Sequence, residues 1–207
     1  MTLELWLTYA LAAGVLLAIP GPTILLVVSY ALTGGRRAAW NTVAGVVLGD
    51  LTAMTLSFVG LGAVLSTSAT AFTVLKWIGA AYLVYLGIRM WMTLVEDGPP
   101  ERQPSRSGRA MLGHAFTVTA LNPKGIVFFV AFVPQFLVPA APMVPQLLLL
   151  GGTFLFLAFL NAAGYAWLAG RAGHWVRKPA VQRTTHRIGG TLLIGAGLLT
   201  AAARRGA

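Results

Sequence analysis

The chain has 207 residues and a formal net charge of +10; 57% of its residues are hydrophobic and 10% are charged. A soluble domain carries about 25% charged residues, so this composition excludes an ordinary soluble protein and indicates a surface that faces lipid. The absence of cysteine excludes disulfide bonds, thiolate metal sites and thiol redox chemistry.

Three nearly uncharged runs in the first half are each long enough to cross a membrane, which takes about 20 apolar residues in a helix. The first run ends at Gly34-Gly35-Arg36-Arg37, and the second contains a single charge, Asp50. A short polar turn at residues 66–70 precedes the third run. We therefore expect membrane spans over residues 5–32, 39–65 and 72–95.

The second half follows a polar segment with three prolines at residues 96–109, which we expect to be a flexible cytoplasmic linker. The uncharged stretch from Gly125 to Gly170 is too long for one helix, and several prolines divide it. Residues 171–187 are predicted to form a basic loop. The final uncharged run is short and covers only about 24 Å at helical rise. We expect these spans over residues 110–137, 146–170 and 188–203.

Basic residues are distributed unevenly between the two faces that these spans predict. By the positive-inside rule, the more basic face is cytoplasmic, and both termini then lie outside. This asymmetry explains the net charge better than nucleic-acid binding, for which the chain has too few polar residues. The cytoplasmic face would hold Arg36, Arg37, Arg89, Arg102, Arg106, Arg109, Arg171, Arg177, Lys178, Arg183 and Arg187.

The two halves share motifs at nearly constant spacing. Asp50 matches Asn161 at an offset of 111 in the numbering, and Pro20-Gly21-Pro22 matches Asn122-Pro123-Lys124 at an offset of 102. At an offset of 110, part of the third span recurs in the sixth: Ile78, Gly79, Leu83 and Gly87 return as Ile188, Gly189, Leu193 and Gly197.

Because three spans is an odd number, a second copy must enter the membrane from the opposite side. The predicted fold is therefore an all-α, polytopic membrane protein whose six transmembrane helices form two inverted three-helix repeats, an architecture typical of secondary transporters. The repeats would cover residues 1–95 and 110–207, joined by the linker at 96–109 within one integrated membrane domain.

Two proline-containing breaks fall near the middle of the first and fourth predicted spans. Proline removes a backbone donor and clashes with the preceding helical turn. The residues after each break start a half-helix whose free N–H groups and positive dipole end suit a carboxylate. Two breaks at equal depth favour a substrate site, although a kink that only aids packing is the alternative. The candidate substrate-binding residues here are Pro20, Gly21, Pro22, Thr23, Asn122, Pro123 and Lys124.

Asp50 is the only carboxylate at membrane depth, and Lys124 is the only deep cation. Each costs about 2.5–3.5 kcal/mol at a helix centre, so neither is expected to face lipid. Asp50 would bind a substrate ammonium or a coupling proton, because desolvation at this depth lets a carboxylate take up and release protons. Lys124 would hold a carboxylate; a structural ion pair between the two is the alternative. Asn161 is a further candidate for substrate binding, with an interhelical hydrogen bond as its alternative.

Four motifs together resemble the LysE/RhtB family of amino-acid efflux transporters, over nearly the whole chain and in the right order. They are Pro20-Gly21-Pro22, Gly49-Asp50, Asn122-Pro123-Lys124 and the run Lys76-Trp77-Ile78-Gly79-Ala80-Ala81-Tyr82-Leu83. The resemblance implies a multi-pass protein of the bacterial inner membrane that exports amino acids in a proton-linked manner, and it leaves room for a homodimer. The short sixth span departs from the family pattern.

The predicted function is secondary transport that exports amino acids across the cytoplasmic membrane by proton-coupled alternating access, without a metal or other cofactor. A transporter of another small polar metabolite is the first alternative. A membrane enzyme is a weaker one, because the chain lacks a second deep carboxylate, a His-Glu-x-x-His motif and a deep histidine. A non-transporting scaffold would leave both breaks and the deep lysine unexplained.

Overall fold

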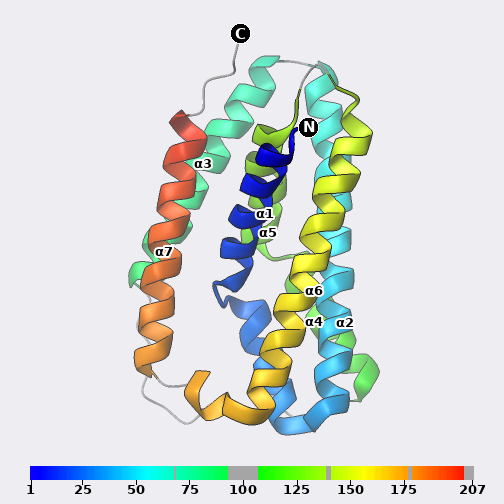
Figure 1. Ribbon diagram of the computed structural model, residues 1–207, viewed down its shortest axis with the longest axis vertical. Helices are drawn as coiled ribbons and strands as arrows, with labels where there is room; N and C mark the ends of the chain where they lie inside the picture. The colour runs from blue at the N-terminus through cyan, green and yellow to red at the C-terminus, as the bar shows by residue number, and fades with distance from the viewer. Residues whose placement is uncertain (68, 93–106, 139–140, 177–178, 203–207) are drawn as a thin grey trace.

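The computed structural model describes residues 1–67, 69–92, 107–138, 141–176 and 179–202, and within these ranges it contains helices and no strand. The elements are α1 (Leu3–Ala18), α2 (Pro22–Thr67), α3 (Ala69–Met92), α4 (Gly108–Ala120), α5 (Pro123–Val127), the π-helix η1 (Phe128–Phe132), the 3₁₀-helix η2 (Val133–Phe136), α6 (Met143–Val176) and α7 (Pro179–Ala202). The helices lie side by side along one long axis (Figure 1).

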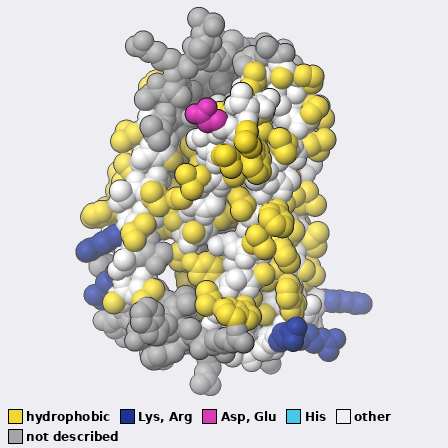
Figure 2. Space-filling view, viewed as in Figure 1, with side chains coloured by type: hydrophobic (Ala, Val, Ile, Leu, Met, Phe, Trp, Pro, Cys, Tyr) yellow, Lys and Arg dark blue, Asp and Glu magenta, His cyan; other side chains and the backbone are white. Residues whose placement is uncertain are grey.

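The length and apolar character of the helices fit a bilayer. Pro22–Gly62 in α2 and Met143–Ala169 in α6 are each long and apolar enough to span it. The pair Gly108–Ala120 and Pro123–Phe136 passes the same criteria together and is bent by 43°. Large apolar side chains cover the visible outside (Figure 2); Leu56 is 69% exposed and Leu148 is 71% exposed. The protein is therefore an all-helical, multi-pass membrane protein.

Gly35 divides α2 into two segments that run in opposite directions (Figure 1). Its backbone adopts φ 66° and ψ −159°, a conformation that glycine reaches without the clash a Cβ would cause. The chain thus turns within Gly34-Gly35-Arg36-Arg37, where the sequence predicted that the first uncharged run ends, and the helix continues on both sides of Gly35.

Both predicted breaks are present. α1 ends at Ala18 and α2 begins at Pro22, while α4 ends at Ala120 and α5 begins at Pro123. The predicted polar turn at 66–70 is shorter than expected, because α2 reaches Thr67 and α3 begins at Ala69. The linker expected at 96–109 lies largely outside the described residues.

The prediction of a basic loop at 171–187 was wrong, and the helix that carries the predicted sixth span at 188–203 begins earlier than that span. α6 continues to Val176, and α7 begins at Pro179 and has 24 residues. The prediction used the uncharged run alone, which measures the apolar thickness of the bilayer. A helix does not end where its residues become charged, and Arg183 and Arg187 lie within α7.

Small residues allow a close helix contact between α2 and α4. A Cβ atom on Gly49 would lie 2.7 Å from the Thr119 Cβ, 2.8 Å from the Phe116 carbonyl oxygen and 3.0 Å from the Ala120 nitrogen. Backbone atoms cannot move aside as a flexible side chain can. The contact holds α2 against the helix that leads into the second break.

We predict that Gly49→Ala destabilises the protein by about 1–3 kcal/mol, the usual cost of overpacking, because the new methyl group collides with α4. Gly60→Ala is the matched control in the same helix, since nothing lies within 4 Å of its added Cβ. Thermal unfolding in detergent would measure both. Equal melting temperatures for the two variants would contradict the proposed close packing.

Candidate functional site

The two breaks meet near mid-height of the molecule (Figure 1) and enclose a cavity of about 40 Å³. The end of α1, both segments of α2, the second break and α6 all contribute to its wall. Its lining residues are Leu16, Leu17, Ile19, Gly21, Thr23, Ile24, Val46, Asp50, Thr119, Asn122, Lys124, Gly125, Phe154, Ala158 and Asn161.

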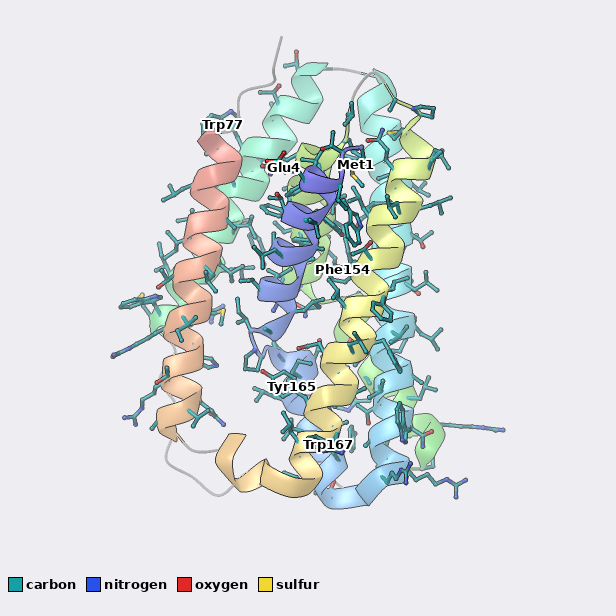
Figure 3. All side chains as sticks on the ribbon, in the orientation of Figure 1. Met1, Glu4, Trp77, Phe154, Tyr165 and Trp167 are labelled. Atoms are coloured by element: carbon teal, nitrogen blue, oxygen red, sulfur yellow. The ribbon has the colours of Figure 1, made fainter. Side chains whose placement is uncertain are left out.

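Side chains from the second half of the chain bind the carbonyl groups at the broken end of α1. The Lys124 ammonium donates to the Leu16 carbonyl at 3.0 Å and to the Ile19 carbonyl at 3.1 Å. Two residues of α6 bind the carbonyls that lie between these two. The Asn161 amide donates to the Leu17 carbonyl and the Tyr165 hydroxyl donates to the Ala18 carbonyl, each at 2.9 Å. Tyr165 and Phe154 lie on the side of α6 nearest α1 (Figure 3).

These bonds satisfy backbone carbonyls that the break in the helix leaves without partners. The last four carbonyls of a helix have no partner within it, and the negative end of the helix dipole favours a cation. At bilayer depth water does not satisfy these groups. Lys124 supplies the cation, and Asn161 and Tyr165 supply neutral donors, so that consecutive carbonyls from Leu16 to Ile19 all have partners.

At the second break, backbone groups are satisfied by hydrogen bonds from residues of the break itself. The Asn122 side-chain oxygen accepts from the Lys124 backbone N–H at 3.1 Å and so caps α5, while the Asn122 backbone N–H donates to the Thr119 carbonyl at 3.0 Å. The Asn122 amide also donates to the Thr23 hydroxyl at 3.3 Å, which joins the two breaks directly. The Thr119 hydroxyl reaches the same Thr23 oxygen at 3.4 Å.

Asp50 lies in the cavity wall and is only 8% exposed. Within the described part of the chain, its carboxylate has no hydrogen bond and no ion pair, so the structural ion pair with Lys124 that the sequence left open is not formed. The two charges still interact electrostatically across the cavity. Asp50 is thus a buried acid without a direct partner among the described residues.

Six of the nine candidate residues line this one cavity: Gly21, Thr23, Asp50, Asn122, Lys124 and Asn161. Pro20, Pro22 and Pro123 do not line it; they shape the backbone at the breaks. Sequence reasoning missed Tyr165 and Thr119. Tyr165 follows Asn161 by one helical turn and therefore lies on the same face of α6, which is the signal that would have found it. No group of three potential metal ligands occurs among the described residues.

The described fold is that of a polytopic helical membrane protein in which two interrupted helices meet at a buried cavity. A family model described as LysE type translocator matches residues 14–203. The chain belongs to this family.

Individual relatives agree with that assignment. An uncharacterised membrane protein of Vibrio cholerae serotype O1 is 35% identical over 99% of this chain and 100% of its own length. The homoserine/homoserine lactone efflux protein of Salmonella typhi is 35% identical over 99% of each chain. The leucine efflux protein of Klebsiella pneumoniae is 31% identical over 64% of this chain and 63% of its own. No solved structure gives a significant match.

We predict that Tyr165→Phe destabilises the protein by about 1–3 kcal/mol, because the Ala18 carbonyl then lacks its partner at depth. Tyr85→Phe is the matched control, since Tyr85 is 50% exposed and no hydrogen bond of its hydroxyl is found in the described part. Thermal unfolding in detergent gives the comparison. The capping role fails if both phenylalanine variants melt together.

Proposed function

We propose that this protein is a secondary transporter that exports amino acids across the cytoplasmic membrane by proton-coupled alternating access. The observation that carries the proposal is the cavity where two broken spans meet, with one unpartnered carboxylate and a set of donors around it. The names of its relatives, which include homoserine and leucine efflux proteins, support an amino acid as the substrate.

The cavity offers a complementary group to each end of a zwitterion. Asp50 would bind the substrate ammonium or an exchanging proton. The substrate carboxylate would meet the first turn of α2, where the Thr23 and Ile24 N–H groups have no intrahelical partner, together with the Lys124 ammonium. Asn122 and Asn161 would complete the polar wall, and Leu16, Val46 and Phe154 would meet the apolar part of the substrate.

The present cavity is too small for this cargo. About 40 Å³ suffices for a water, which needs about 10–15 Å³ on this measure, but not for an amino acid. Binding therefore requires the walls to separate. Side-chain bonds from Lys124, Asn161 and Tyr165 hold the end of α1 to the rest of the wall, and we place the opening step at these bonds.

Alternating access would follow from two inverted three-helix repeats, and the packing of α3 on α7 supports that architecture. A Cβ on Gly87 would meet the Ile194 nitrogen at 2.9 Å and would also contact the Gly190 carbonyl. A Cβ on Gly197, the counterpart of Gly87, would meet the Ala80 carbonyl at 2.7 Å and the Val84 nitrogen at 3.1 Å. Ala80 and Val84 are the counterparts of Gly190 and Ile194 at the same offset of 110. A two-fold relation between the halves accounts for this reciprocity.

The direction of the helices supports the same relation. In Figure 1, α1 runs downward from the N-terminus while α4 and α5 run upward, and α3 and α7 also run in opposite directions. The second segment of α2 runs upward and α6 runs downward. We therefore infer six spans in two repeats, residues 1–95 and 110–207, with the linker at 96–109 on the cytoplasmic side.

The absence of native cysteines allows a direct test of this topology with single cysteines near the starts of the two repeats. We predict that Thr2→Cys reacts with a membrane-impermeant maleimide on intact cells, whereas Ala110→Cys reacts only after permeabilisation. Blocking each site with a permeant reagent first is the control. Labelling of both positions from the same side would rule out inverted repeats.

The transport proposal is tested in proteoliposomes that contain the purified protein and an imposed pH gradient. We predict that the wild type moves labelled homoserine or leucine in response to the gradient and moves lysine poorly. Asp50→Asn should remain folded but fall to the rate of protein-free liposomes, because the amide cannot exchange a proton. Gly60→Ala serves as a transport-competent control.

Each outcome bears on a different part of the proposal. No accumulation of any amino acid by the wild type would remove amino-acid transport and favour another polar metabolite or a scaffold. Gradient-driven transport by Asp50→Asn at the wild-type rate would remove Asp50 from the coupling mechanism while leaving the transport function intact.

A further inference from the structure

A polar groove lies outside the central cavity, between the Gly35 turn of α2 and the start of α4. It has a volume of about 540 Å³ and is lined by Gly34, Arg37, Ala38, Asn41, Ser107, Gly108, Arg109 and Met111. We propose that this groove binds the headgroup of an anionic phospholipid at the cytoplasmic surface of the membrane. The site would be separate from the transport site, and its function does not depend on which substrate is carried.

The depth of the two arginines places the groove at the level of the lipid phosphates. Arg37 precedes Asp50 along α2, and Arg109 precedes Asn122 along α4 by the same separation in the sequence. That separation is roughly three and a half helical turns, so each arginine lies about 20 Å from the central cavity along its helix. Half the hydrocarbon thickness is about 15 Å, so both lie just beyond the acyl chains.

The chemistry of the groove is that of an anion site. Arg37 and Arg109 are exposed, and within the described part of the chain no acidic side chain lines the groove and neither guanidinium has a hydrogen bond or ion pair. Asn41 and Ser107 add neutral hydrogen-bonding groups. A Cβ on Gly108 would collide with the Asn41 amide, so the glycine lets this amide approach the start of α4.

These features favour a lipid with net negative charge over a zwitterionic one. Arginine binds phosphate oxygens in a bidentate manner, and basic pockets between transmembrane helices on the cytoplasmic side suit anionic headgroups. The ammonium of a zwitterionic headgroup would be repelled by two arginines with no described acid beside them. A bound headgroup would bridge α2 in the first half and α4 in the second, and would stabilise their contact.

The neighbouring Arg36 provides a matched control. It lines a different groove together with Trp40 and Trp167, so Arg36→Gln removes the same charge from the same turn without changing the proposed site. A general attraction between basic residues and an acidic membrane surface would respond equally to Arg36→Gln and Arg37→Gln.

The experiment titrates the detergent-purified, full-length protein with phosphatidylglycerol or phosphatidylcholine and measures retained lipid by native mass spectrometry and the melting temperature. We expect phosphatidylglycerol to raise the melting temperature of the wild type and phosphatidylcholine to leave it unchanged. Arg37→Gln and Arg109→Gln should each weaken phosphatidylglycerol binding about tenfold, the loss expected for a hydrogen bond to a charged group, while Arg36→Gln should change it much less.

Three results would overturn the proposal. They are equal binding of the two lipids by the wild type, an equal loss of binding in Arg36→Gln and Arg37→Gln, and displacement of the lipid by millimolar inorganic phosphate, which would assign the groove to a soluble anion. The first measurement uses only wild-type protein, so it decides the matter even if a variant fails to fold.

Discussion

The bonds that satisfy the broken end of α1 are the interaction on which the rest of this structure depends. A helix that ends inside the bilayer exposes carbonyl groups that lipid cannot satisfy. Here the side-chain donors to those carbonyls come from the second half of the chain: Lys124 beside the second break, and Asn161 and Tyr165 on α6. The first half therefore does not close its own break, and the two halves are held together at the point where the cavity forms.

The two breaks are closed in different ways for a reason that lies in their sequences. At the second break the Asn122 backbone N–H bonds the Thr119 carbonyl. At the offset of 102 in the numbering, Pro20 stands where the second half has Asn122, and Leu17 stands where it has Thr119; proline has no N–H. The Asn161 side chain bonds Leu17 instead. Asp50, which matches Asn161 at the offset of 111 in the numbering, cannot bond a carbonyl in the same way, because an ionised carboxylate accepts hydrogen bonds and has none to donate.

Much of the fold was readable from the sequence, and the parts that were not have physical causes. Hydropathy indicated the long apolar helices α2 and α6, and proline located both breaks, because these signals act on the residues that carry them. Hydropathy did not give the length of α7, since charged residues such as Arg183 continue a helix into water. Hydropathy also placed Lys124 within an apolar run, but it did not show which groups the side chain would contact. The partners of Lys124 are backbone carbonyls of α1, which have no signature in the sequence.

The engagement of Lys124 with α1 bears on which substrates the cavity suits. The Lys124 ammonium is already stabilised by two carbonyls and the negative end of the helix dipole. These carbonyls are therefore occupied, and Asp50 is the group of this cavity that can bind a substrate cation. A zwitterionic amino acid adds no net charge, and its ammonium would use that single carboxylate. A dicationic amino acid would bring a second cation, and an unpaired charge at a helix centre costs about 2.5–3.5 kcal/mol. On the proposed binding mode, the opened cavity would therefore favour amino acids with neutral side chains.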